Sequence, residues 1–284
     1  MSDAAADTGA LPPPAALAPA ASAPRSAPLF RVRLHGVVLP LVLLVAWELA
    51  VRADWISARL MPPPSVLWDT FGELLVDGNL LSHVLVSFAR VAAGFTIGAL
   101  LAVTVGAAVG LSRRVEEIVD PTFQALRAIP SLAWVPLLLL WLGIDEAPKI
   151  TLIAIGAFFP ICLAVVSGMR NVDRKLVEVG LICGLRGAEL VRRIFIPASL
   201  PSVFTGLRTG LSLSWMFLIA AELIAATQGI GYLLTDGRET GRADIVLTAI
   251  VTLAVLGKLT DSLFKALEGR LLAWRDSYHA ASDD

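Results

Sequence analysis

The residue types that most often perform catalysis form no recognisable catalytic pattern in this sequence. The three histidines are scattered far apart and give neither a metal site nor a triad: His35, His83 and His279. The one Gly-Lys pair, Gly257-Lys258, lacks the remaining residues of a nucleotide-binding loop. We therefore expect no catalytic, cofactor-binding or metal-binding residue. If ATP powers this protein, another chain must bind it.

Charged and polar residues inside a long apolar stretch are the better functional candidates. Arg208, Trp215 and Glu222 are seven residues apart, so they share one face of an expected helix. Ser212 lies one turn from Arg208. A charge at the centre of a bilayer costs about 2.5 to 3.5 kcal/mol unless it is paired or hydrated. We expect this face to border a translocation path.

A structural role for these charges is the alternative. Arg208 or Glu222 could pair across helices with a basic residue of another apolar stretch, either Arg90 or Lys258. Both arrangements remove the cost of an isolated charge, so both stay open from the residues alone.

The segment from residue 170 to 201 has the composition of a cytoplasmic loop. Its six basic residues cannot lie in hydrocarbon, and positively charged loops stay on the cytoplasmic side. We expect two short helices separated near Gly184 and Gly187, because glycine accepts the left-handed geometry that ends helices. The second helix is expected over residues 188–195, ended by the prolines that follow it.

This second helix carries an apolar face that is expected to bind a partner. Leu190, Ile194 and Pro197 fall at three- and four-residue spacings, with Arg192 and Arg193 beside them. The alternative is an amphipathic helix that lies on the inner leaflet.

Composition places the chain among integral membrane proteins of all-α fold. Its mean hydropathy is +0.75, and 56% of its residues are hydrophobic against 17% charged. A hydrocarbon core of about 30 Å needs about 20 apolar residues per helix. Six spans are expected, at residues 36–51, 84–111, 129–142, 150–169, 203–227 and 245–264. Pro130 and Pro136 interrupt the third, which a separate helix over 115–127 precedes, and an external amphipathic helix is expected over 66–76.

The distribution of Lys and Arg predicts the orientation in the membrane. Of the 23 Lys and Arg residues, 15 lie on the side of both tails and five on the opposite side, which predicts that both termini are cytoplasmic. Four regions are expected: a disordered Ala/Pro-rich tail (1–28), the first span with its external segment (29–82), the core transmembrane domain (83–275) and a C-terminal tail (276–284).

Small residues recur every four positions in two of the expected spans. The second span has Gly94, Gly98, Ala102, Gly106 and Gly110, and the fifth has Gly206, Gly210 and Ser214. Such stripes let another helix approach closely. We expect the second and fifth spans to be the central helices.

Two external loops are candidates for contact with a partner outside the membrane. The acidic loop over residues 142–149 contains Asp145 and Glu146, and the glycine-hinged apolar turn over 228–234 contains Tyr232.

The basic loop resembles the EAA loop of importer-type ABC permeases. Glu178 is followed six residues later by Gly184, ten residues further by Ile194, and then by Ile196-Pro197. The family core reads Glu-Ala-Ala, whereas this chain has Gly180 at the third position. Glycine there lowers the helix propensity by about 1 kcal/mol relative to alanine. The resemblance implies a coupling helix that docks into a cytoplasmic ATPase. The residues it assigns to docking are Glu178, Gly184, Arg186, Leu190, Arg192, Arg193, Ile194, Ile196 and Pro197.

Over residues 37–278 the chain resembles the nitrate, sulfonate and taurine group of these permeases, and within it the aliphatic sulfonate permeases. The matching segments are 60–65 (LMPPPS), 140–146 (LWLGIDE), 168–173 (GMRNVD), 206–208 (GLR), 229–233 (GIGYL) and 256–261 (LGKLTD). The resemblance implies a type I importer in the bacterial inner membrane. Its expected partners are a second copy of the chain, a cytoplasmic ATPase dimer, a periplasmic solute-binding protein and lipid, with no nucleic acid.

Other solutes and another class of transport remain as alternatives. The same group includes carriers of pyrimidine vitamin precursors. A secondary transporter that needs no ATPase, or a membrane scaffold, is the alternative of another class, although the sequence has no clear internal repeat.

Overall fold

The computed structural model describes residues 35–272, and every regular element in that range is helical. The elements are α1 (His35–Arg52), α2 (Pro64–Val76), α3 (Asn79–Leu111), α4 (Arg113–Ala128), the 3-10 turn η1 (Ser131–Trp134), α5 (Val135–Leu142), α6 (Glu146–Arg170), α7 (Arg174–Ile182), α8 (Ala188–Leu190), the π turn η2 (Val191–Phe195), α9 (Ile196–Ala225), α10 (Ile230–Glu239) and α11 (Ala243–Leu271). The all-α prediction is confirmed for this part of the chain. The tails predicted over 1–28 and 276–284 lie outside the described residues.

The helices that can cross a membrane agree with the expected number of about six. Four are long and apolar enough: α3, α6, α8 to α9 as one helix over residues 188–225, and α11. Helix α4 and the segment 131–142 form a fifth unit, bent by 86°. The bend falls at Pro130, where the sequence predicted an interruption. Helix α1, with its exposed leucines and valines, covers the first predicted span, residues 36–51.

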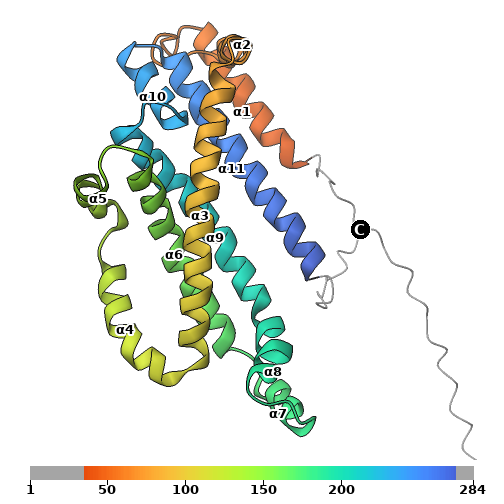
Figure 1. Ribbon diagram of the computed structural model, residues 1–284. Helices are drawn as coiled ribbons and strands as arrows, with labels where there is room; N and C mark the ends of the chain where they lie inside the picture. The colour runs from red at the N-terminus through yellow and green to blue at the C-terminus, as the bar shows by residue number, and fades with distance from the viewer. Residues whose placement is uncertain (1–34, 273–284) are drawn as a thin grey trace, which may run out of the picture.

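Helix α6 is the centre of the bundle, packed between α3 and α9 (Figure 1). The close approach predicted from the small residues is confirmed. A Cβ on Gly98 of α3 would lie 2.5 Å from the Ala154 carbonyl oxygen of α6, and one on Gly210 of α9 would lie 2.6 Å from Ile161 of α6. Both glycine stripes face α6, so the two spans that the sequence predicted to be central pack on either side of this helix.

The basic loop forms a helical tip that projects beyond one end of the bundle (Figure 1). Helix α7 ends at Ile182, and Gly184 and Gly187 have φ of 82° and 52°, so the predicted glycine break is confirmed. From α8 the chain continues through the π turn η2 directly into α9.

The expected end of the second tip helix at Phe195 is wrong. The helix runs on through Pro197 and Pro201. Pro197 lies at the start of α9, directly after the π turn η2. The wider π turn before it has already interrupted the regular pattern of bonds. The tip is therefore joined to α9 by continuous helix.

Helices α2 and α10 lie at the opposite end of the bundle from α7 (Figure 1). The glycine-hinged turn expected near residue 230 is the start of a ten-residue helix, α10. Helix α1 runs toward α2, and α11 runs away from α10. The first residues of α1 and the last residues of α11 therefore point toward the end of the bundle that carries the tip.

Candidate functional site

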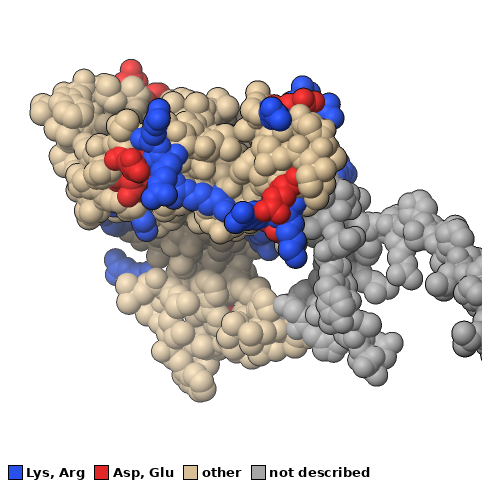
Figure 2. All heavy atoms as spheres, turned by 90° about the horizontal axis from the view of Figure 1, so that it is seen from below, with Lys and Arg blue, Asp and Glu red and all other residues tan. Residues whose placement is uncertain are grey.

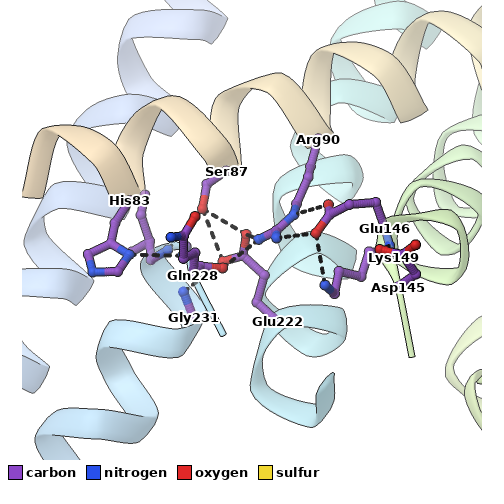
Figure 3. A network of polar contacts seen from close by, with 11 residues as sticks. His83, Ser87, Arg90, Asp145, Glu146, Lys149, Glu222, Gln228 and Gly231 are labelled. Carbon is purple, nitrogen blue, oxygen red and sulfur yellow. Dashed lines mark hydrogen bonds and ion pairs between the residues drawn. The ribbon is translucent and has the colours of Figure 1, made fainter. Parts of the chain in front are cut away.

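Glu222 of α9 is enclosed by hydrogen-bond donors from two other helices, α3 and α10 (Figure 3). Ser87 Oγ of α3 lies 2.8 and 3.0 Å from its two carboxylate oxygens, and Arg90 Nη1 donates to Oε1 at 2.7 Å. The backbone N–H of Gly231 in α10 donates to Oε2 at 2.8 Å. The carboxylate side chain is 0% exposed. Its charge is therefore stable only because these partners replace water.

Arg90 connects Glu222 to the start of α6. Its Nε and Nη2 each donate to the Glu146 carboxylate at 2.6 Å, a bidentate pair. Its Nη1 also donates to the Gln228 carbonyl oxygen at 2.6 Å. Lys149 Nζ lies 3.0 Å from Glu146 Oε1. The two cations, Arg90 and Lys149, balance the two carboxylates, so the network is neutral. The pairing of Glu222 with Arg90, which the sequence offered as the alternative to a path role, is present.

The same network holds the beginning of α10. The Gly229 N–H donates to His83 Nδ1 at 3.0 Å, and the Ile230 N–H donates to Ser87 Oγ at 2.8 Å. These amides precede or open the helix, where no helical partner exists for them. Gly229 has φ of 122°, and a Cβ there would lie 2.4 Å from Glu222 Oε1. Glycine is therefore required at this position. Together these bonds fix α10 against α3 and α9.

The other predicted path residues contact α11. Arg208 Nε and Nη2 donate to Asp261 Oδ1 at 3.0 and 2.9 Å, and Trp215 Nε1 donates to Thr260 Oγ1 at 3.1 Å. Trp215 is buried, whereas Ser212 is exposed and bonds the Arg208 carbonyl oxygen.

The α11 partners of Arg208 and Trp215 were not predicted from the sequence. Asp261 and Thr260 lie in the segment 256–261, which was noticed only as part of a resemblance. Glu268 adds a second acid, 3.6 Å from Arg208. The Arg208 charge is thus already balanced by acids of α11 within one protomer.

At the tip, the structure turns part of the expected docking face inward. Leu190 and Ile194 are half-buried against α7, and a Cβ on Gly180 would lie 2.8 Å from Leu190 Cδ1 and 3.2 Å from Ile194 Cγ1. Gly180, where the EAA family has alanine, therefore lets the two tip helices pack closely. Pro197 is half-buried at the base of the tip.

The remaining predicted docking residues lie on the outside of the tip. Glu178 accepts a hydrogen bond from Arg174 at 2.8 Å, and Arg193 pairs with Glu189 at 3.0 Å. The exposed members of the set are Glu178, Gly184, Arg186, Arg192, Arg193 and Ile196. Figure 2, which looks at this end of the molecule, shows Lys and Arg side chains spread across it with a few acids between them.

Four apolar side chains of α7 are exposed and were not predicted: Leu176, Val179, Leu181 and Ile182. Val179 is 57% exposed and Ile182 is 85% exposed. They could have been predicted from their position in the charged loop. Apolar side chains on a segment that faces water indicate contact with a partner.

The three residues predicted to contact a partner at the end opposite the tip are not all accessible to it. Asp145 is exposed and caps α6 by accepting from the Glu146 N–H at 2.8 Å. Glu146 is 48% exposed but engaged by Arg90 and Lys149. Tyr232 is half-buried, with its ring centroid 5.8 Å from that of His83.

The long apolar helices of the bundle fit a multi-pass membrane protein, and comparison with known proteins gives its class. Residues 79–273 match the family described as "Binding-protein-dependent transport system inner membrane component". The chain belongs to this family. It is a multi-pass membrane permease of an ABC importer.

Among curated relatives, two named "Putative aliphatic sulfonates transport permease protein SsuC" are similar over most of their length. The one from Escherichia coli is 42% identical over 87% of this chain and 94% of its own, and the one from Bacillus subtilis is 40% identical over 86% and 89%. The taurine transport system permease protein TauC of Escherichia coli is 33% identical over 82% of this chain and 86% of its own.

Solved transporters share the fold. The inward-facing MetNI methionine ABC transporter has a chain with a TM-score of 0.61 at 18% identity, covering 69% of this chain and 97% of its own. An amino acid ABC transporter with histidines gives a TM-score of 0.56 at 14% identity, covering 72% and 97%.

Proposed function

We propose that this permease forms the translocation path for aliphatic sulfonates. The observation that carries the proposal is the 40 to 42% identity, over 86 to 87% of this chain, to two proteins named as aliphatic sulfonate permeases. The taurine relative supports it, because taurine is itself a sulfonate. A bicarbonate permease, CmpB of Synechococcus elongatus, is 30% identical, so small anions are the common theme.

The cytoplasmic ATPase dimer docks on the tip formed by α7, α8 and η2. The support is that this tip exposes both apolar side chains, such as Val179 and Ile182, and the cations Arg186 and Arg192. An apolar centre with a charged rim is typical of a protein interface. Since α8 and α9 are one continuous helix, displacement of the tip by the ATPase moves α9 as well.

Two copies of the chain enclose the path, and the exposed part of α9 around Arg208 and Ser212 borders it. Glu222 and Trp215 have little or no exposed surface, so they act on the path by holding α9 in place. Arg208 attracts an anion only when its bond to Asp261 opens, because the acid otherwise neutralises its charge.

A solute-binding protein meets the end that carries α2 and α10, near Asp145, Glu146 and Tyr232. The tip then lies in the cytoplasm together with both termini. The excess of Lys and Arg on that side supports this orientation.

A growth experiment tests the solute. A strain that lacks this gene is supplied in turn with an alkanesulfonate, taurine or sulfate as its sulfur source. The proposal predicts failure on the alkanesulfonate, normal growth on sulfate, and rescue by the intact gene. Normal growth on every sulfonate, with a requirement for a pyrimidine vitamin precursor instead, would contradict it.

A further inference from the structure

Three successive backbone amides at the start of α10 each donate to a side chain of α3 or α9. Amides at the start of a helix have no acceptor within the helix, so these side chains fix the position where α10 begins. The three bonds run from the Gly229 N–H to His83 Nδ1 at 3.0 Å, from the Ile230 N–H to Ser87 Oγ at 2.8 Å and from the Gly231 N–H to Glu222 Oε2 at 2.8 Å.

The first of these bonds requires a neutral histidine. A backbone N–H can only donate, so Nδ1 of His83 carries no proton and the ring proton is on Nε2. Figure 3 shows the ring directed toward the chain just before α10. In the protonated ring both nitrogens are donors, and no acceptor remains for Gly229. Among the three acceptors, histidine is the residue type that ordinarily changes its charge between about pH 5 and pH 8.

The charged groups around His83 favour movement of a protonated ring away from Gly229. The carboxylates that act on the ring are Glu222 of α9 and Asp236 of α10. Both attract a cation, whereas the Gly229 N–H repels it. Tyr232 of α10, the other titratable neighbour, lies beside the ring with centroids 5.8 Å apart.

The remaining charges near this end of α3 are already paired. Arg90, the one charged residue of α3, donates to Glu222 at 2.7 Å. On α2, Glu73 lies 3.5 Å from Arg242, and Asp69 is exposed. His83 is the fifth residue of α3 and is only partly buried, so protons from solvent reach its ring.

The effect of losing this bond is confined to the first turn of α10. Ile230 and Leu233 are 0% and 4% exposed, and they remain anchored in an apolar cluster with Leu74 and Leu80. The Gly229 N–H, by contrast, has His83 as its one acceptor among the described residues.

We propose that protonation of His83 releases the first turn of α10 from α3. His83 is a positioning residue that acts through the Gly229 amide. The contact is present above the pH at which the ring titrates and is lost as the pH falls through it. Helix α10 carries Tyr232, so the surface at this end of the bundle changes with pH. The change involves no solute and does not depend on which solute is transported.

The test is hydrogen exchange, read by mass spectrometry, on the transporter purified from membranes in mild detergent. Exchange is compared at about pH 7.5 and about pH 5, on either side of the ordinary titration of histidine, and each rate is divided by the intrinsic rate at that pH. The variants are His83→Asn and His83→Ala. The asparagine Oδ1 is as many bonds from the backbone as the histidine Nδ1, so it can accept from Gly229 but gains no proton. Alanine removes the acceptor at both pH values.

In the wild type, the protection of the amides at the start of α10 should fall about tenfold at the lower pH, as expected for the loss of one hydrogen bond. The amides of α6 should not change. His83→Asn should keep its protection at both pH values, and His83→Ala should lack it at both. Equal protection of the wild type at the two pH values would overturn the proposal. So would a fall in His83→Asn as large as in the wild type, a fall that α6 shares, or full protection in His83→Ala at the higher pH.

Discussion

Arg90 of α3 and Glu222 of α9 form an ion pair of 2.7 Å although 132 residues separate them in the sequence. Ser87 and Gly231 complete the shell of the carboxylate, and Glu146 completes that of the guanidinium. The pair therefore joins three spanning helices and the start of α10 at one point. Its charges are tolerable in the bundle only as a neutral set.

Glu222→Gln should destabilise the protein severely. The substitution leaves Arg90 and Lys149 facing the single carboxylate of Glu146, and breaking a buried pair costs about 3 to 5 kcal/mol. A lower Tm of the purified chain in detergent measures the loss. Glu239→Gln, at an exposed carboxylate, is the control and should not change the Tm.

The double variant Arg90→Met with Glu222→Leu separates loss of charge balance from loss of packing. It removes both members of the pair, so Glu146 and Lys149 still balance each other. We expect it to recover part of the Tm lost in Glu222→Gln. A double variant less stable than the single one would show that charge balance is not the cause.

Ser87→Ala should weaken the attachment of α10. It removes a donor to Glu222 and the acceptor of the Ile230 N–H, so we expect a loss of about 1 to 3 kcal/mol. Hydrogen exchange of the α10 amides should rise relative to that of α6. Ser82→Ala, an exposed serine of the same helix, is the comparison, and equal exchange in both variants would count against this role.

Gly229→Ala should displace α10 and stop transport. The new Cβ meets the Glu222 carboxylate, and φ of 122° is strained for any residue with a side chain. Uptake in proteoliposomes checks the prediction. Gly257→Ala is the matched control, because nothing lies within 4 Å of its Cβ position. Uptake that is lost equally in both, or in neither, would refute it.

Arg208→Ala should lower sulfonate uptake at least tenfold with little change in stability. The guanidinium and Asp261 are both about a third exposed, so their pair contributes at most about 1 kcal/mol. Uptake and Tm are measured on the same preparations, with the exposed Thr209→Ala as control. A collapse of Tm together with uptake would assign Arg208 a structural role instead.

Hydropathy and proline positions predicted most of the fold. The external helix expected over 66–76 is α2, and the interruption at Pro130 is the bend between α4 and α5. Helix packing was harder to predict. The glycines of α3 and α9 indicate a close approach but do not name the partner, and both face α6.

The charge network could be predicted only in part. Arg90 was named as a possible partner of Glu222 because few basic residues lie in apolar stretches. The roles of Ser87, His83 and Gly229 could not be inferred, because they depend on how α10 folds back onto α3. The inward turn of Leu190 and Ile194 likewise depends on the packing of α7.

The most direct test of the account is whether the exposed apolar surface of the tip holds the ATPase. Ile182→Glu places a charge on a side chain that is 85% exposed, so it should leave folding intact while it abolishes co-purification of the ATPase and ATP-dependent sulfonate uptake. Val76→Glu, 87% exposed at the end of α2 and away from the tip, is the control and should keep the ATPase bound. An Ile182→Glu transporter that keeps its ATPase and imports sulfonate at the wild-type rate would contradict the account.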